Sequence, residues 1–247
     1  MPLPGGTPVG ADAQTPITRI ALIRPDARTR YAQLAPVDRH ASATTLLIRH
    51  AHTDAIGLRL SGRTPGIHLS AEGRAEAERL GRALAGVTLT AIYTSPLERA
   101  VETARRIAQH QGIVETIRDE LSEIDFGLWT GKTFAELEQD RGWQIYNRCR
   151  GSASVPGGES AAAVQSRMVA VLKTLAASHE GQRIAIVSHG DPLRYAVLQF
   201  TGASLDRYSD VTILPASVSA VVWLPEGPRL LYVNDRRFAG MVEDGDV

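Results

Sequence analysis

Short apolar runs closed by polar or turn-forming residues alternate along this chain with longer segments that repeat apolar positions at helical spacing. The short runs are typical of buried strands, and the longer segments are typical of amphipathic helices. Their alternation indicates βαβ units and therefore an α/β fold built on a parallel sheet. We predict strands at residues 44–49, 90–94, 113–117, 183–188, 217–224 and 229–233, and helices at residues 71–86, 96–111, 133–141, 159–179 and 191–201.

Three of the predicted helices have a recognisable start. Ser95 precedes a proline and lies three residues before Glu98, which predicts an N-cap serine, a proline at the first helical position and a capping box. Asp191 is also followed by proline, and Ser70 gives a weaker signal of the same kind.

The chain divides into one large domain and two flanking segments. Residues 1–43 are rich in Pro, Gly, Thr and Ala, and we interpret them as a partly irregular N-terminal appendage in which residues 17–23 are apolar enough for an edge strand. Residues 44–240 show no internal repeat, low-complexity tract or second core, so we predict a single domain there. Residues 241–247 form a C-terminal tail.

Composition narrows the function classes. The 247 residues are 43% hydrophobic, and 27 Lys and Arg balance 27 Asp and Glu, so no overall field favours nucleic acid or an anionic membrane as a partner. Cys149 is the single cysteine, which excludes an internal disulfide. No run approaches the ~18 apolar residues of a bilayer span, and the first residues lack the features of a secretory signal. We therefore expect a cytoplasmic protein.

Histidine follows two of the predicted strands. His50 comes directly after the strand at residues 44–49, and His189 directly after the strand at residues 183–188. In open α/β sheets the ligand crevice lies beyond the carboxyl ends of the strands. Both imidazoles are therefore expected to face one crevice.

Two arginines point to an anion in that crevice. Arg99 falls in the first turn of a predicted helix, where the positive end of the helix dipole disfavours a cation unless an anion binds there. Arg49 ends a buried strand, where a charge is seldom left unpaired. A bound phosphate satisfies both arginines. A neutral imidazole is a competent nucleophile near neutral pH, so His50 is the expected nucleophile, with Arg49, Arg99 and His189 holding the phosphoryl oxygens.

Such a reaction also needs a general acid to protonate the leaving oxygen. Glu123 and Asp125 both lie in a segment after the strand at residues 113–117. Their spacing alone does not rank one above the other.

Several ordered motifs between residues 44 and 236 resemble those of the histidine phosphatase superfamily, also called phosphoglycerate mutase-like, branch 1. They are Arg49-His50-Ala51, residues 94–100 with Thr103, Glu123 within a Glu-x-x-x-Gly-x-Trp-x-Gly run, Pro156-Gly157-Gly158-Glu159-Ser160, Ser188-His189-Gly190, and Asn234-Asp235.

The resemblance implies a three-layer α/β/α sandwich with a mixed, mostly parallel central sheet, no metal, no cofactor and a phosphohistidine intermediate. It assigns His50 as the nucleophile and Glu123 rather than Asp125 as the proton donor. Arg49, Arg99 and His189 form the phosphate pocket by the same likeness. Arg59 and Gly190 are also placed at the substrate.

The chain departs from this pattern in three places. Ala51 replaces the commoner glycine after the nucleophile. Residues 53–56 lack the asparagine that many members place about six residues after the histidine, so no phosphate-binding role is carried over to that position. The N-terminal appendage has no counterpart in the family.

The phosphoenzyme of this family passes its phosphoryl group either to water or to a second hydroxyl. Mutases of this family resemble one another in carrying a long insertion after the acidic motif. Here only residues 132–155 separate the Gly-x-Trp-x-Gly run from Pro156-Gly157-Gly158. This short separation favours a phosphatase acting on a small phosphorylated metabolite. A phosphoglycerate-type phosphomutase is the alternative. Homodimer formation is left open. Nearby aromatic residues either line the pocket or pack in the core, namely Trp129, Phe134, Trp143 and Tyr146.

Two other classes compete with this interpretation. A metal-dependent hydrolase could use His50 and His52 on one strand face with His68 or His189, although Arg49 beside them disfavours a divalent cation. A non-catalytic module that binds phosphorylated ligands is the second alternative. No obvious catalytic residue is missing, which favours an enzyme.

Overall fold

Six strands form one mixed sheet in the order β3-β2-β4-β1-β5-β6 in the computed structural model, which describes residues 43–239. The first four are mutually parallel, and β5 runs antiparallel to both of its neighbours. The predicted edge strand at residues 17–23 and the tail at residues 241–247 lie outside the described residues. The strands are β1 (Ala43–Arg49), β2 (Ala91–Thr94), β3 (Glu115–Ile117), β4 (Gln182–Ser188), β5 (Val218–Leu224) and β6 (Gly227–Asp235).

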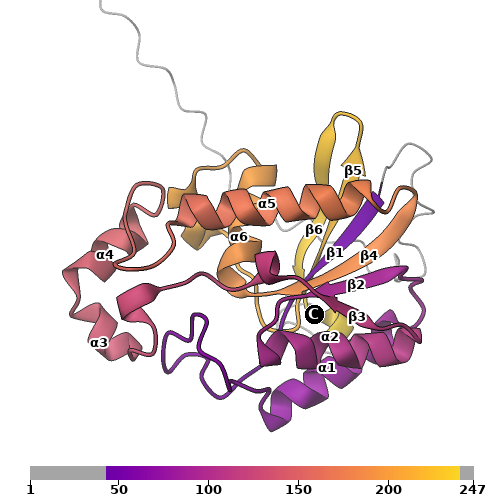
Figure 1. Cartoon of the computed structure of the whole chain (residues 1–247), viewed down its shortest axis with the longest axis horizontal. Coiled ribbons are helices and arrows are strands. Elements are labelled where there is room, and N and C mark those ends of the chain that lie inside the picture. The colour runs from indigo at the N-terminus through magenta and orange to yellow at the C-terminus, as the bar shows by residue number, and fades with distance from the viewer. Residues whose placement is uncertain (1–42, 240–247) are drawn as a thin grey trace, which may run out of the picture.

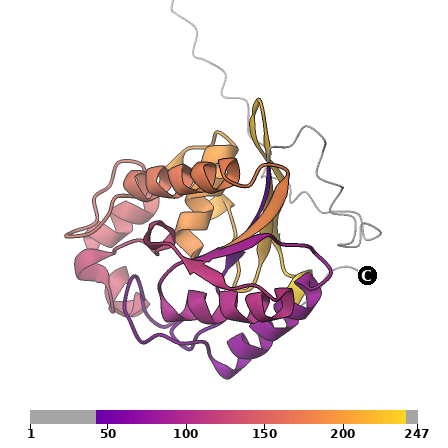
Figure 2. The ribbon, with the colours of Figure 1, turned by 45° about the vertical axis from the view of Figure 1, so that its right-hand side comes forward.

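Helices cover both faces of the sheet, which gives the three layers that were predicted (Figures 1 and 2). Strand residues alternate between two apolar cores: Leu47 and Ile186 face the core beneath α5 and α6, and Leu46 and Val187 face the core beneath α1 and α2. Both cores are fully buried, as expected for central parallel strands. The helices are α1 (Ala71–Leu84), α2 (Glu98–Gln111), α3 (Phe134–Glu138), α4 (Arg141–Arg148), α5 (Ala161–Ala177) and α6 (Gly190–Phe200). Between residues 43 and 239, every helix falls short of the length and apolarity that crossing a bilayer requires.

Two of the predicted helix starts were wrong, and the differences bear on the site. Helix α2 begins at Glu98 with Leu97 as its N-cap, so the predicted capping box at Ser95 does not form. The Ser95 hydroxyl instead lies 2.7 Å from a ring nitrogen of His189. Helix α6 begins at Gly190, so Asp191 lies inside the first turn rather than at the cap. The Ser70 cap of α1 is confirmed, because its hydroxyl accepts a hydrogen bond from the backbone N–H of Gly73.

The segment predicted as a helix at residues 133–141 contains the shorter helix α3, and a second helix that the sequence did not predict, α4, begins at its last residue, Arg141. Helix α3 is capped by Thr133 and α4 by Asp140, whose carboxylate accepts a hydrogen bond from the N–H of Trp143. Both lie beside the sheet rather than on it, at the side of the molecule opposite the β5–β6 hairpin (Figure 1). This position makes them a cover for the carboxyl ends of the strands.

Candidate active site

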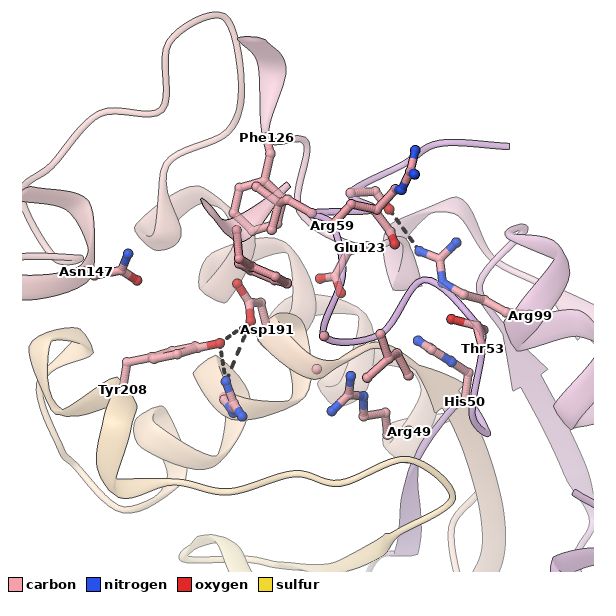
Figure 3. A pocket seen from close by; sticks show the side chains of 18 of the residues that line it. Arg49, His50, Thr53, Arg59, Arg99, Glu123, Phe126, Asn147, Asp191 and Tyr208 are labelled. Atoms are coloured by element: carbon pink, nitrogen blue, oxygen red, sulfur yellow. Dashed lines mark hydrogen bonds and ion pairs between the residues drawn. The ribbon is translucent and has the colours of Figure 1, made fainter. Parts of the chain in front are cut away.

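A cavity of about 330 Å³, here called the pocket, lies where β1 and α6 meet the two covering helices (Figure 3). Residues from six separate stretches of the chain line it, and most of them are polar. The lining residues are Arg49, His50, Thr53, Ile56, Gly57, Arg59, Leu60, Ser61, Gly62, Arg99, Glu123, Phe126, Phe134, Trp143, Asn147, Arg150, Gly190, Asp191, Arg194 and Tyr208.

His50 is held in one tautomer. Its Nδ1 lies 2.8 Å from the carbonyl oxygen of Ala51, and because a carbonyl only accepts, Nδ1 must carry the proton. In the neutral ring this leaves a lone pair on Nε2. Burial lowers the pKa of His50 well below its ordinary value, and the charges of Arg99 and Arg49 lower it further. The ring is therefore neutral at pH 7 and nucleophilic at Nε2.

His189 lies beside His50, with the ring centroids 5.2 Å apart. It is fully buried and is not among the residues named above as lining the pocket. The Ser95 hydroxyl lies 2.7 Å from Nε2 and already accepts a hydrogen bond from Leu97 N–H, so its own proton is available to Nε2. Nδ1 then carries the ring proton, and among the described residues it has no partner. Burial lowers the pKa of this histidine too, assisted by Arg99 and His50.

Arg49 and Arg99 are anchored in the same way. One nitrogen of Arg49 donates to the carbonyl of Ile213 at 2.7 Å, and one nitrogen of Arg99 donates to the carbonyl of Gly62 at 2.8 Å. Each guanidinium also has a buried nitrogen without a partner in the described part of the chain, Nε of Arg49 and Nη1 of Arg99. Unpaired buried donors are costly, so both arginines are preorganised for an anion that the pocket receives.

Glu123 and Asp125, which spacing could not rank, are separated by the structure. Glu123 lines the pocket, and burial raises its pKa to about 7. The negative charge of Asp191 raises the pKa further, whereas the hydrogen bond from Ile124 N–H and the charges of Arg99 and Arg49 oppose the rise. Asp125 is not among the lining residues, because its carboxylate accepts a hydrogen bond from Gly127 N–H at 2.9 Å. Glu123 is thus the carboxyl group that is able to hold a proton near neutral pH and face a ligand.

The other sequence-predicted residues are distributed unevenly around the pocket. Gly190 lines it, and its Cα lies against the guanidinium of Arg49. Arg59 lines it with an exposed side chain, and its backbone pairs with Thr133 of the covering segment. Thr53, from the segment where no role was carried over, is buried and lines the pocket next to His50 (Figure 3).

The four aromatic residues divide into two groups. Phe134 and Trp143 line the pocket, whereas Trp129 and Tyr146 are buried in the core. Phe126, which the sequence did not single out, completes the apolar side of the pocket.

The sequence also missed a polar network at the far end of the pocket. Asp191 accepts a hydrogen bond from Tyr208 and pairs with Arg150 at 3.2 Å, while Arg194 donates to the same tyrosine hydroxyl (Figure 3). The guanidinium of Arg150 stacks 3.4 Å from the centroid of the Tyr208 ring. Only Asp191 had a sequence signal, and it was interpreted as a helix cap.

Charge in the pocket is unbalanced. Five arginines line it against two carboxylates, Glu123 and Asp191, although the chain as a whole is neutral. Asp191 pairs with Arg150, and both histidines are neutral because their pKa values are lowered. The remaining excess of positive charge favours a ligand with at least two negative charges, such as a phosphate monoester dianion.

The residues of the metal-site alternative do not converge. His52 lies 3.0 Å from the Ser70 hydroxyl, and His68 pairs with Glu102. Across residues 43–239, no three His, Cys, Asp or Glu side chains are grouped so that they could share a metal ion. Cys149 is exposed and lies outside the pocket lining.

Comparison with known proteins finds similarity along most of the described residues. The sequence model of the histidine phosphatase superfamily (branch 1) matches residues 45–236. Phosphoserine phosphatase 1 of Hydrogenobacter thermophilus is 30% identical over 71% of this chain and 84% of its own length. The probable phosphoglycerate mutase GpmB of Salmonella choleraesuis is 31% identical over 73% of this chain and 87% of its own length. Three longer mycobacterial relatives are matched over 42% of their length, so the chain spans less than half of those proteins.

Solved structures show the same architecture. The phosphoserine phosphatase of Entamoeba histolytica in complex with 3-phosphoglyceric acid superposes with a TM-score of 0.72 at 26% identity, covering 80% of this chain and 99% of that protein. The likeness extends over nearly the whole of the described region.

Proposed function

This chain belongs to branch 1 of the histidine phosphatase superfamily and is a phosphomonoester hydrolase of that superfamily, and from this we propose that it acts on small phosphorylated metabolites through a phosphohistidine on His50. One observation carries the proposal. The neutral imidazole of His50, with its lone pair on Nε2, lies in a pocket with Arg49 and Arg99. Each of these arginines has a buried nitrogen without a hydrogen-bond partner among the described residues. That combination suits in-line attack on a phosphoryl group.

In the first step Nε2 of His50 attacks phosphorus, and the bond from phosphorus to the ester oxygen breaks. Arg49, Arg99 and Nδ1–H of His189 stabilise the charge on the three equatorial oxygens. Glu123 donates its proton to the leaving oxygen, which departs as an alcohol. Its raised pKa keeps a substantial fraction protonated at neutral pH.

In the second step the ionised Glu123 accepts a proton from a water molecule as that water attacks the phosphohistidine. The bond from phosphorus to Nε2 breaks, inorganic phosphate is released, and His50 returns to its neutral form. Glu123 regains the proton it gave away, so the cycle is balanced. General acid and general base are the same carboxyl group in turn.

Water is favoured over a second hydroxyl as the acceptor because the cover is short. Helices α3 and α4 contain only five and eight residues, and they are the whole helical content between the two motifs. The alternative of a phosphomutase finds support in the similarity to a probable mutase. A phosphatase releases inorganic phosphate in the same amount as the alcohol and transfers none to an added phosphoglycerate. A phosphomutase would transfer the phosphoryl group instead.

Charge balance also bears on the substrate. Asp191 pairs with both Arg150 and Arg194, and the five lining arginines carry more charge than Glu123, Asp191 and a phosphate monoester dianion together compensate. A substrate with a further negative group, such as a carboxylate, is therefore favoured. Arg194 is the residue that we assign to it, because it lines the pocket and its buried Nε has no partner among the described residues.

The deciding experiment is incubation of the purified chain with 4-nitrophenyl phosphate from pH 5 to 8, followed by quenching and isolation of the protein. We expect nitrophenol release and an acid-labile phosphoryl group on His50. Phosphate binding without release would identify a binding module instead. Release that disappears on exhaustive chelation and returns with a divalent cation would identify a metal-dependent hydrolase.

A further inference from the structure

Two loops dock backbone against backbone behind Glu123. The acid segment (residues 120–127) contacts the glycine segment (residues 155–158), where Leu128 N–H donates to the Pro156 carbonyl at 2.9 Å. A Cβ at Gly127 would lie 2.2 Å from the Pro156 carbonyl oxygen, and a Cβ at Gly158 would lie 2.2 Å from that of Asp125. Only glycine permits this approach.

The docking brings Glu159 alongside the acid segment. Its backbone N–H donates to the Asp125 carbonyl at 2.8 Å, and its Oε2 accepts a hydrogen bond from the Asp125 N–H at 3.1 Å. The same oxygen accepts from Arg63 at 2.7 Å and from Arg167 at 3.0 Å. Burial opposes ionisation of Glu159, but the hydrogen bonds from Arg167 and Asp125 outweigh it and lower the pKa. Glu159 is therefore ionised and holds two arginines together.

Both arginines also reach the backbone of the acid itself. Nε of Arg63 donates to the Glu123 carbonyl at 2.9 Å, and Nη2 of Arg167 approaches the same oxygen at 3.4 Å. Arg167 additionally donates to the carbonyl of Ser122 at 2.9 Å. Two cations bound to one carboxylate thus converge on one carbonyl oxygen.

That carbonyl belongs to the peptide group that orients the Glu123 side chain. Ile124 N–H, on the other side of the same planar peptide, donates to Oε1 of Glu123 at 3.0 Å. Rotation of the peptide would break the bonds to the arginines and to the carboxyl group together. We propose that Glu159, acting through Arg63 and Arg167, is a positioning residue that fixes the direction in which Glu123 delivers its proton. This inference rests on the proposed role of Glu123 as general acid.

The arrangement also joins the acid to the phosphate end of the pocket. Arg63 directly follows Gly62, whose carbonyl accepts the hydrogen bond from Arg99 at 2.8 Å. One dipeptide therefore contacts a phosphate-end arginine on one side and the Glu123 carbonyl on the other. The distance between the proton donor and the phosphoryl group depends on both contacts.

Leaving-group dependence tests the proposal, because an alkyl alcohol needs a proton to depart and 4-nitrophenolate does not. In Glu159→Gln we expect kcat/KM for glycerol 2-phosphate to fall at least tenfold, and kcat/KM for 4-nitrophenyl phosphate to change less than threefold. The side chain of Arg63 is 39% exposed and therefore tolerant of substitution. In Arg63→Met we also expect kcat/KM for glycerol 2-phosphate to fall more than kcat/KM for 4-nitrophenyl phosphate. Orthovanadate binding and the thermal unfolding midpoint establish that each variant is folded with an intact phosphate end.

Asp125→Asn is the matched control, because it neutralises a carboxylate in the acid segment that bonds only locally to Gly127 N–H. It should affect both esters equally. Equal losses on the two esters in folded Glu159→Gln and Arg63→Met, or no loss in either, would overturn the positioning role. A wild-type chain that hydrolyses neither ester would instead refute the proposed function itself.

Discussion

The imidazole rings of His50 and His189 lie 5.2 Å apart and are tilted by 58°. Strand register explains this pairing, because Arg49 of β1 lies opposite Ser188 of β4 and the two histidines follow directly. Burial and the neighbouring arginines lower both pKa values, so the pair is neutral at physiological pH. One ring is thereby available as a nucleophile and the other as a hydrogen-bond donor.

The pKa directions predict the pH profile of kcat/KM. His50 must be neutral, and because its pKa lies well below 6.5 the acidic limb should fall below pH 6.5. Glu123 must be protonated, so activity on glycerol 2-phosphate should decline as the pH rises through about 7. The corresponding decline for 4-nitrophenyl phosphate should be weak. An identical alkaline limb for both esters would argue against Glu123 as the acid.

His50→Ala should reduce turnover at least about 10³-fold, since it removes the nucleophile and no neighbouring group replaces it. Phosphoenzyme formation should disappear, while cooperative thermal unfolding should persist. His52→Ala is the matched control, because that imidazole lies outside the pocket lining and bonds to Ser70. It should retain activity within about threefold. Comparable losses in the two variants would remove the special role of position 50.

Glu123→Gln keeps the side-chain shape but removes the transferable proton. We expect about 10² to 10⁴-fold slower phosphoenzyme formation from glycerol 2-phosphate and a much smaller effect with 4-nitrophenyl phosphate, measured by rapid quench. Glu120→Gln, an exposed carboxylate of the same segment, should leave both rates unchanged. A uniform effect of Glu123→Gln on the two esters would indicate a role in binding rather than in proton transfer.

The excess positive charge predicts a preference between two matched esters. O-phosphoserine differs from O-phosphoethanolamine only by a carboxylate, and we expect kcat/KM to favour phosphoserine about tenfold, or about 1.4 kcal/mol. Arg194→Gln should reduce that preference because it removes one of the five cations that line the pocket. Equal rates for the two esters in the wild-type chain would show that the pocket does not select a second anion.

Much of the fold was predictable because its strands are short, apolar and buried. The phosphate end was predictable for the same reason: residues that directly follow parallel strands share one edge of the sheet, so His50 and His189 had to meet there. Arg99 was identified because a cation in the first turn of a helix is unfavourable without an anion. In each case a local pattern had a definite spatial consequence.

The rest depended on tertiary packing that no local pattern encodes. Arg150 follows α4, a helix that the sequence did not predict beyond its first residue, and Tyr208 lies in a 3₁₀ segment at residues 205–210, yet the two side chains stack. The sequence predicted Ser95 as a helix cap, but its hydroxyl forms a hydrogen bond with a ring nitrogen of His189 instead. Spacing left Glu123 and Asp125 unranked, and the family resemblance alone favoured Glu123. Only the structure shows that Glu123 lines the pocket and that Asp125 does not.

The covering helices α3 and α4 stand apart from the sheet that carries the phosphate-handling groups. Part of the pocket lining is thus encoded apart from the strand ends that carry His50 and Arg49. Mutant libraries confined to residues 133–148 can exchange one ester preference for another while the reactive histidine and its arginines stay on rigid strand ends.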